Sequence, residues 1–236
     1  MKLNGLIITG TDTDVGKTYV SSLIIQQLAA LTERVGAYKP VCSGASFNSQ
    51  GEPVWQDVVE LKTSLPKEYP QDWICPQRFL AAYAPSIAAR AEQKRVDDRL
   101  LIGGLKVWQG QVDYLVLEGA GGLLSPLSDA HNLADMAEII RFPIVIVAPN
   151  QVGVINHTLL TVEAAKSRGL QVAGIIMNTV QPDPETLLET MHAEEIALRT
   201  DVPILGIIPY ASEMMLQPNG HPATIDWMKL MSRTGL

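Results

Sequence analysis

The sequence predicts an α/β fold in which a mostly parallel, doubly wound sheet is flanked by helices. Apolar runs of strand length alternate with helix-like segments along most of the 236 residues. This is the pattern of parallel strands joined by right-handed helical crossovers. Residues 143–147 form a continuous apolar run, as expected for a strand covered on both faces. A glycine-containing loop, residues 10–18, stands between the first apolar run and the first helical pattern.

The loop of residues 10–18, Gly-Thr-Asp-Thr-Asp-Val-Gly-Lys-Thr, predicts a phosphate-binding site. A helix that begins at Gly16 or Lys17 would direct its free N–H groups and its positive dipole end at a bound phosphate. Lys17 would supply a cation for the outer phosphates, and the Thr18 hydroxyl can ligate Mg²⁺. Five residues, instead of the usual four, separate the two glycines. The alternative is a turn that only caps the helix.

The composition favours one compact domain over residues 1–236. A chain that is 47% hydrophobic can bury a sizeable core at this length, and its net charge of -7 gives no basic footprint for nucleic acid or an anionic membrane. Cys42 and Cys75 stand far apart and outside metal-ligand spacing, which fits reduced thiols. The N-terminus lacks a signal-peptide pattern, and no run reaches membrane-spanning length. We therefore expect a cytoplasmic protein without nucleic-acid or membrane partners.

In the first third of the chain, Gly36 is expected to end the first helix and residues 37–41 to form a short second strand. Lys39 lies at the C-terminal end of this strand, where open parallel sheets have their ligand crevice; the alternative is a solvated surface charge. Residues 43–56 are rich in Ser, Gly, Asn and Gln and indicate a flexible loop. Asp57 then opens a short helix, either as its N-cap or as a metal ligand.

A second acidic candidate follows the apolar run 113–117. Residues 64–78 before it are expected to be an irregular connection, with helices over residues 84–93 and 97–108. Glu118 ends the run and is followed by Gly-Ala-Gly-Gly. A carboxylate at the carboxyl end of a buried strand, beside glycines that allow close approach, is typical of the place where nucleotide-binding folds hold Mg²⁺ or a water. Glu118 is therefore the best metal candidate, with a solvated acid in a turn as the alternative.

The C-terminal half continues the alternation. Strands are expected over residues 143–147, 172–177 and 204–208, and helices over residues 156–166 and 184–199. Asn178 follows one of these strands, and Pro209 and Tyr210 follow another. The methionine-rich tail, residues 214–236, carries a weak helix and is expected to pack or to form a contact surface. The four histidines form no cluster with carboxylates at metal-ligand spacing.

Taken together, four segments of the chain resemble the dethiobiotin synthetases. They are GTDTDVGKT, YKPVCSG, EGAGG with a following Pro-Leu, and GVINHTLLT, in the correct order over roughly residues 6–210. The widened phosphate loop and the YKPV segment rarely coincide elsewhere, so the combination is specific. The resemblance implies a P-loop NTPase fold and an ATP- and Mg²⁺-dependent ligase of biotin biosynthesis. Such a ligase closes the ureido ring of dethiobiotin from 7,8-diaminopelargonate and CO₂ or bicarbonate, through a carbamate and a carbamic-phosphoric anhydride.

The resemblance also implies roles for individual residues. The metal ligands would be Thr18, Asp57 and Glu118. The carbamate and the phosphoryl group would be handled by Lys17, Lys39, Thr13 and Ser43. The nucleotide would contact Asp14, Val15, Gly16, Lys17, Thr18, Tyr19, Glu118, Asn178, Pro209 and Tyr210. In a homodimer, Gly153, Val154 and Asn156 would receive the distal carboxylate of the substrate from the other subunit, at a helix N-terminus.

The chain departs from the family's pattern on the substrate side. Gln151 stands where many relatives carry a basic residue, and Met191 lies near a position where some carry a tyrosine that touches the substrate. Pro85 and Ser86 replace the usual Pro-His. These departures leave phosphate and metal binding intact and bear on the contacts to diaminopelargonate.

Two other classes of protein share this type of phosphate loop. A partitioning or septum-positioning ATPase, which is a nucleotide-switched binding module, usually carries an extra lysine early in the loop, whereas positions 11–15 contain none. A cobyrinate or cobyric acid synthase needs an added glutaminase domain with a nucleophilic cysteine and a histidine. The 236 residues leave no room for that domain.

Overall fold

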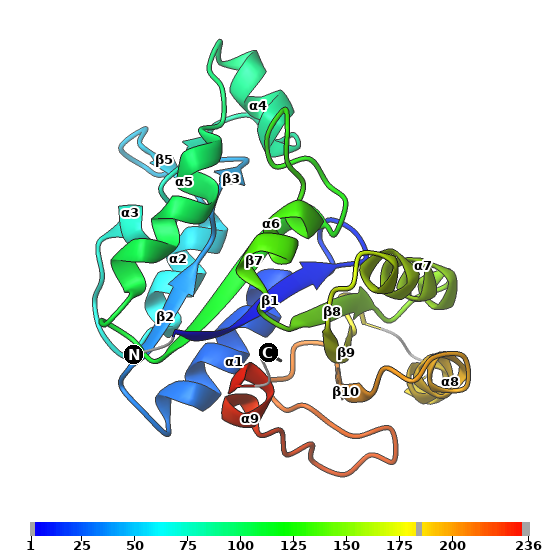
Figure 1. Ribbon diagram of the computed structural model, residues 1–236. Coiled ribbons are helices and arrows are strands. Elements are labelled where there is room, and N and C mark those ends of the chain that lie inside the picture. The colour runs from blue at the N-terminus through cyan, green and yellow to red at the C-terminus, as the bar shows by residue number, and fades with distance from the viewer. Residues whose placement is uncertain (1–2, 183–185, 233–236) are drawn as a thin grey trace.

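A six-stranded parallel sheet forms the centre of the molecule, with strand order β10-β9-β8-β1-β7-β2 (Figure 1). The computed structural model describes residues 3–182 and 186–232, and side chains outside residues 186–189. The strands are β1 (Asn4–Gly10), β2 (Val35–Tyr38), β7 (Tyr114–Gly122), β8 (Ile144–Pro149), β9 (Val172–Asn178) and β10 (Ile204–Ile208). The chain moves from β1 toward β2 and later from β7 back to β8, so the direction of winding reverses around β1 and creates a ligand crevice at the carboxyl ends of these strands.

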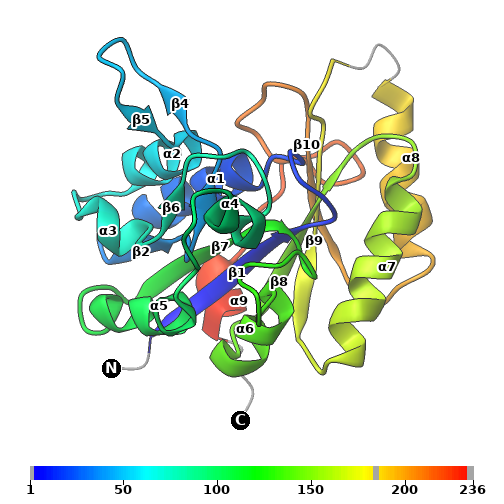
Figure 2. The same cartoon turned by 90° about the horizontal axis from the view of Figure 1, so that it is seen from above.

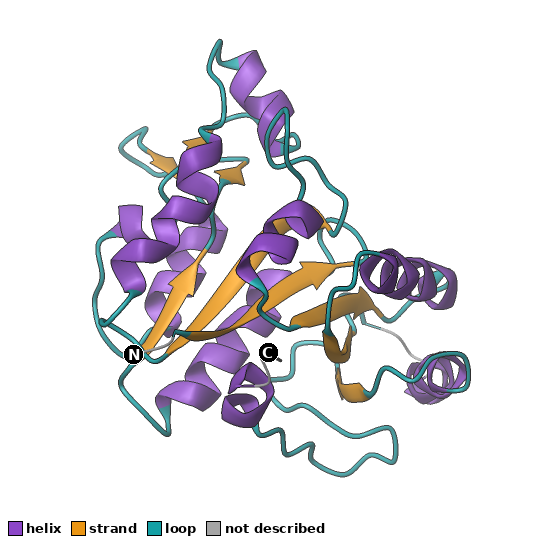
Figure 3. Cartoon of the chain, viewed as in Figure 1, coloured by secondary structure: helices purple, strands orange, loops and turns teal. Residues whose placement is uncertain are grey.

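Helices cover both faces of the sheet, with α1 behind it and α6 in front of it in the view of Figure 3. The helices are α1 (Lys17–Ala29), α2 (Gln56–Ser64), α3 (Gln71–Ile74), α4 (Pro85–Ala91), α5 (Asp98–Gly103), α6 (Leu133–Ile140), α7 (Val154–Ser167), α8 (Thr186–Ala197) and α9 (Trp227–Ser232), with a 3-10 helix, η1, at Gly104–Trp108. Helices α7 and α8 pack side by side at one end of the sheet, and α2 and α3 lie at the other end (Figure 2). The expected doubly wound α/β architecture is confirmed.

The core lies between the sheet and these helices. All six residues of β8 are buried, and Leu6, Ile7 and Ile8 of β1 have no exposed surface. Val20 and Ile24 of α1 are buried completely as well, because they lie on the helical face that packs on the sheet. Burial on both faces explains why the central strands read as continuous apolar runs.

The prediction that Gly36 ends the first helix is wrong. Helix α1 ends at Ala29, and Gly36 lies within β2. A Cβ atom at Gly36 would come within 2.7 Å of the Trp108 ring, so this glycine allows the ring to pack directly on the strand. Gly36 therefore serves the close packing of Trp108 on β2 and not the end of α1.

Three further expectations need correction. Residues 43–56 are not a structureless loop, because β4 (Ser46–Phe47) and β5 (Pro53–Val54) pair as an antiparallel ribbon. Residues 64–78 contain α3 and the first residue of β6 (Arg78–Phe79), which pairs with β3 (Cys42–Ser43). Asp57 does not cap α2: the N-cap is Trp55, and Asp57 lies in the first turn.

Helix α6 has no counterpart among the expected elements. Its start carries a reciprocal capping box: the Asn132 side chain accepts from the Asp135 N–H, and the Asp135 carboxylate accepts from the Asn132 N–H. The spacing of these two residues was the available signal. Of the helix expected over residues 184–199, positions 184 and 185 lie outside the described residues, and α8 accounts for most of the remainder. Within the described part of the chain, no helix is long and apolar enough to cross a membrane.

Candidate active site

The phosphate loop connects β1 to α1 at the centre of the sheet. Asp14 and Gly16 both have left-handed backbone conformations, with φ of 57° and 86°. A Cβ atom at Gly16 would lie 2.1 Å from the Asn178 amide nitrogen, so only glycine fits there. Asn178, at the end of β9, donates that amide to the Val15 carbonyl at 3.0 Å. The end of β9, two strands away from β1, therefore braces the loop in a shape whose helix N-terminus faces the crevice.

Lys17 is largely buried beneath this loop. Lys17 is 7% exposed, and its ammonium donates to the Asp12 carbonyl at 2.8 Å. Burial lowers the pKa of Lys17 below its usual value, while the nearby Glu118 carboxylate opposes that shift. The Lys17 ammonium is held by a main-chain carbonyl and not by a carboxylate. An incoming phosphate oxygen can therefore replace the Asp12 carbonyl as its acceptor without breaking an ion pair.

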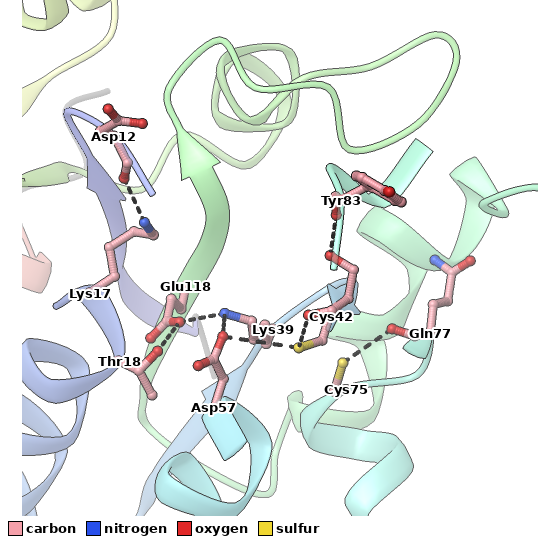
Figure 4. Close-up of polar contacts among 11 residues, drawn as sticks. Asp12, Lys17, Thr18, Lys39, Cys42, Asp57, Cys75, Gln77, Tyr83 and Glu118 are labelled. Atoms are coloured by element: carbon pink, nitrogen blue, oxygen red, sulfur yellow. Dashed lines mark hydrogen bonds and ion pairs between the residues drawn. The ribbon is translucent and has the colours of Figure 1, made fainter. Parts of the chain in front are cut away.

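A second cationic group, Lys39, is clamped between two acids, as Figure 4 shows. Its Nζ lies 2.5 Å from Glu118 Oε1 and 2.7 Å from Asp57 Oδ2. The Thr18 hydroxyl donates to the same Glu118 oxygen at 2.7 Å. The four side chains come from β7, α1, α2 and the end of β2, so the tertiary structure joins elements that are far apart in the sequence.

The charge states of this cluster follow from its burial. Burial by itself would lower the pKa of Lys39, but the Glu118 and Asp57 charges outweigh it and hold that pKa well above its usual value. For Asp57, burial acts to raise the pKa, and the Lys39 charge and hydrogen bond prevail and lower it. Lys39 is thus a permanent cation at the floor of the crevice rather than a proton acceptor.

The crevice above these residues is a cavity of about 680 Å³. Of the expected site residues, it is lined by Thr13, Asp14, Gly16, Lys17, Thr18, Tyr19, Lys39, Ser43 and Asp57. Glu118 is completely buried behind them. The Ser43 hydroxyl donates to the Tyr83 carbonyl at 2.6 Å, which fixes the β3 segment against the wall that ends at Pro85.

Other expected residues lie outside the cavity lining. Pro209 and Tyr210 follow β10, with Tyr210 51% exposed. At the start of α7, Gly153 is the N-cap in a left-handed conformation, Val154 is buried and Asn156 is exposed. The departures Gln151 and Met191 are exposed, Pro85 lines the cavity, and Ser86 is buried. The structure therefore collects the phosphate and metal candidates in one place and leaves the expected distal-carboxylate residues apart from them.

Thr18, Asp57 and Glu118 form a donor set that suits Mg²⁺. The second oxygen of Glu118, Oε2, is buried and has no hydrogen-bond partner in the described chain. A buried carboxylate oxygen without a hydrogen-bond donor destabilises the fold unless a cation binds to it. Within the described residues, no three His, Cys, Asp or Glu side chains gather as a metal cage. One hydroxyl and two carboxylates match the sparse protein ligation of Mg²⁺, which keeps waters and binds substrate phosphates.

Several residues that line the cavity are not among those predicted from the sequence. Glu60, one helical turn after Asp57, Tyr83 and Ser125 all line the cavity. Cys42 lines it too, and burial raises the pKa of its thiol to about 11, so it remains a neutral wall residue. The helical spacing of Asp57 and Glu60 was visible in the sequence. The other contacts depend on how the loops fold over the crevice.

Comparison with known families gives a consistent result. A family model described as an AAA domain matches residues 4–217. An ATP-dependent dethiobiotin synthetase BioD of Rhodopirellula baltica is 36% identical over 230 residues, covering 92% of this chain and 90% of the relative. One from Anoxybacillus flavithermus is 36% identical over 216 residues, covering 91% of this chain and 96% of the relative.

Solved structures share the fold at low sequence identity. A ParA family ATPase from Chlorobium tepidum gives a TM-score of 0.51 at 12% identity, covering 88% of this chain and 85% of that chain. The MinC:MinD cell division protein complex of Aquifex aeolicus gives a TM-score of 0.50 at 15% identity, covering 98% of this chain and 86% of that chain. At such identities the likeness concerns the architecture alone.

Proposed function

The chain belongs to the family of ATP-dependent dethiobiotin synthetases, which are ligases of biotin biosynthesis, and we propose that it closes the ureido ring of dethiobiotin from 7,8-diaminopelargonate, CO₂ and ATP. The observation that carries the proposal is the pair of buried lysines at one cavity. Lys17 lies beneath the phosphate loop, and Lys39 lies between Glu118 and Asp57 at the floor.

The reaction needs both cations because its two partners are anions. One substrate amine adds to CO₂ and loses a proton, giving a carbamate. A carbamate oxygen then attacks the γ-phosphorus of ATP, ADP leaves, and a carbamic-phosphoric anhydride forms. The second amine attacks the anhydride carbon, phosphate leaves, and the ring closes with loss of a proton. Lys39 would hold the carbamate and Lys17 the transferring phosphoryl group, so that two mutually repelling anions meet in line.

Thr13 and Ser43 complete the carbamate side of the proposed site. Both line the cavity, and Ser43 is anchored to the Tyr83 carbonyl. A hydroxyl held in this way can rotate to donate to an anionic oxygen without losing its position. Thr18, Asp57 and Glu118 would hold Mg²⁺, which when bound neutralises charge on the phosphate oxygens.

The base of ATP would lie toward Asn178, Pro209 and Tyr210. The Asn178 amide nitrogen is committed to the Val15 carbonyl, which leaves its side-chain oxygen as an acceptor for an exocyclic amine of the base. Asp14, Val15, Gly16 and Tyr19 continue the nucleotide contacts along the loop and the first turn of α1. Because the Asn178 amide is fixed in this orientation, its oxygen favours adenine, which offers an amine at that position, over a base that offers a carbonyl.

The far end of diaminopelargonate would reach a second copy of the chain. Exposed residues 151–153 precede α7, and Val152 is 94% exposed. In a homodimer this end of α7 would face the other subunit's cavity, and N–H groups at Gly153, Val154 and Asn156 would hold the substrate carboxylate. Gln151 would contribute a neutral amide where many relatives have a cation.

The direct test uses purified protein with diaminopelargonate, bicarbonate, ATP and Mg²⁺. We expect dethiobiotin and ADP in equal amounts, measured by mass spectrometry and a coupled ADP assay, and loss of both products when Mg²⁺ is chelated. Protein that is folded and binds ATP, yet forms no dethiobiotin above the enzyme-free control, would rule the proposal out.

A further inference from the structure

The segment after β10 folds back on the strand that it leaves. Residues 209–216, here called the return loop, are closed at their base by two hydrogen bonds between Ile207 and Leu216, at 2.7 and 2.8 Å. Ser212 donates its N–H to the Pro209 carbonyl at 3.1 Å, and Ala211 takes a left-handed conformation with φ of 52°. The turn at the tip therefore stores some backbone strain that other contacts must hold.

A tyrosine of α1 provides one such contact. Tyr19 directly follows Thr18 and lines the cavity. Its hydroxyl donates to the Ser212 carbonyl at 2.7 Å. Because the acceptor belongs to the main chain, the bond restrains the path of the loop itself.

The hydrogen bond from Tyr19 to the Ser212 carbonyl, here called the tether, joins the two ends of the proposed nucleotide site. Its donor lies in the first turn of α1, where the phosphates are expected, and its acceptor lies two residues after Tyr210, where the base is expected. We infer that Tyr19 is a positioning residue, which holds the return loop in the conformation that receives the base of the nucleotide. Ordering the loop before binding removes part of the entropy loss that binding would otherwise carry. This inference rests on the proposed function for the identity of the ligand.

The test is Tyr19→Phe, which keeps the ring and removes only the hydroxyl. We expect the Kd for ATP, measured by calorimetry, to rise about three- to tenfold, the range of one net hydrogen bond. The Kd for inorganic tripolyphosphate should stay within twofold of wild type, because that ligand has no base to meet the loop. The KM for ATP should rise in parallel with the Kd.

Gln27→Ala is the matched control. Gln27 of α1 accepts from the Trp227 ring N–H at 2.7 Å, so this variant also removes one bond between α1 and the tail, but beyond the return loop. Its Kd for ATP should equal that of wild type. In ligand-free Tyr19→Phe, amide hydrogen exchange of residues 210–216 should accelerate several-fold relative to both proteins, whatever reaction the chain catalyses.

Three results would overturn the inference. One is an unchanged Kd for ATP in Tyr19→Phe, and another is an equal loss of ATP and tripolyphosphate binding, which would assign Tyr19 to the phosphates. The third is unchanged exchange of the return loop. Absence of dethiobiotin formation would instead remove the proposed ligase reaction and leave the base-dependent tether standing.

Discussion

At the scale of single residues, Lys39 defines the site. It is 2% exposed, and it lies between a completely buried carboxylate, Glu118, and a half-exposed one, Asp57. A buried cation is stable only while its anionic partners remain, since removal of any member of the cluster leaves an uncompensated charge. The same arrangement presents a fixed positive charge to the cavity, where an anionic intermediate would gain most from it.

Lys39→Ala should lose turnover and keep nucleotide affinity. We expect kcat to fall about 100- to 1,000-fold, the usual cost of removing one preorganised charge from a reacting anion, with the Kd for ATP within a few-fold of wild type. Steady-state kinetics and calorimetry measure the two quantities. Lys67→Ala is the control, because Lys67 is 51% exposed and pairs with Glu33 on the surface. A Lys39→Ala protein with nearly full activity would contradict the proposed role.

At the scale of elements, α6 supports the strand that carries Glu118. Gly119 of β7 meets the Leu133 side chain so closely that a Cβ atom would lie 2.3 Å from Leu133 Cδ2. Helix α6 is short, and its first turn is fixed by the reciprocal bonds of Asn132 and Asp135. The stability of this cap therefore reaches the active site through direct packing.

Asn132→Ala should destabilise the protein by about 0.5–2 kcal/mol, the usual cost of losing an N-cap side chain. The free energy of unfolding, from urea denaturation, is the measurement. Gln171→Ala, at an exposed position before β9, should change it by less than about 0.5 kcal/mol. Equal effects of the two substitutions would show that the capping bonds contribute nothing beyond a surface contact.

Asp135→Asn should destabilise the protein in a pH-dependent way. Burial acts to raise the pKa of Asp135, but the Asn132 N–H and the Arg168 guanidinium prevail and lower it below its ordinary 3.8. A lowered carboxyl pKa adds stability above the ordinary value, and that stability disappears as pH falls through the lowered one. The variant should therefore be less stable than wild type by roughly 1 kcal/mol at pH 7, with the difference shrinking toward pH 3.

Urea denaturation at several pH values measures this difference. Asp129→Asn serves as the control, because Asp129 is 52% exposed and its oxygen lies 3.8 Å from Arg90. Its effect should be small at every pH. A difference for Asp135→Asn that stays constant from pH 7 to pH 3 would mean that the carboxylate charge plays no part.

At the scale of the whole molecule, the carboxyl ends of β1, β7 and β9 converge on one edge of the sheet. The phosphate loop follows β1 and Asn178 ends β9, while Glu118 lies within β7, which continues to Gly122. Beyond the same edge, Val152 projects with 94% of its surface exposed, and Leu160 of α7 is 59% exposed. These two exposed apolar side chains are the ones that the proposed second copy of the chain would cover.

Val152→Asp should convert the proposed dimer to monomer. We expect the mass from light scattering to halve, and the KM for diaminopelargonate to rise at least tenfold, because burying a charge at the centre of an interface is strongly unfavourable. The Kd for ATP should not change. Leu31→Asp, at a residue 70% exposed beyond the far end of α1, is the control. A wild-type chain that is monomeric at working concentration, with full activity, would refute the dimer.

The sequence by itself determines the fold class and the phosphate loop, because both depend on local chemistry. Apolar runs covered on two faces are recognisable at any position, and the loop's glycines and Lys17 lie within nine residues of one another. Lys39 could be placed at a strand end for the same reason, since all parallel strands end at one edge of the sheet. The expectation that Glu118 ends its strand is wrong, because the glycine-rich segment after it continues β7 to Gly122.

Only the tertiary structure decides how those residues meet. Lys39 and Glu118 stand 79 positions apart, and nothing in either neighbourhood states that one carboxylate oxygen receives both Lys39 and Thr18. The tether from Tyr19 to Ser212 spans 193 positions and ends on a main-chain carbonyl, which has no sequence signature. The prediction for Gly36 is wrong for a related reason, since Trp108, which packs against it, belongs to a distant part of the chain. Local conformation follows from neighbouring residues, whereas contact between distant residues is fixed by the packing of the whole core.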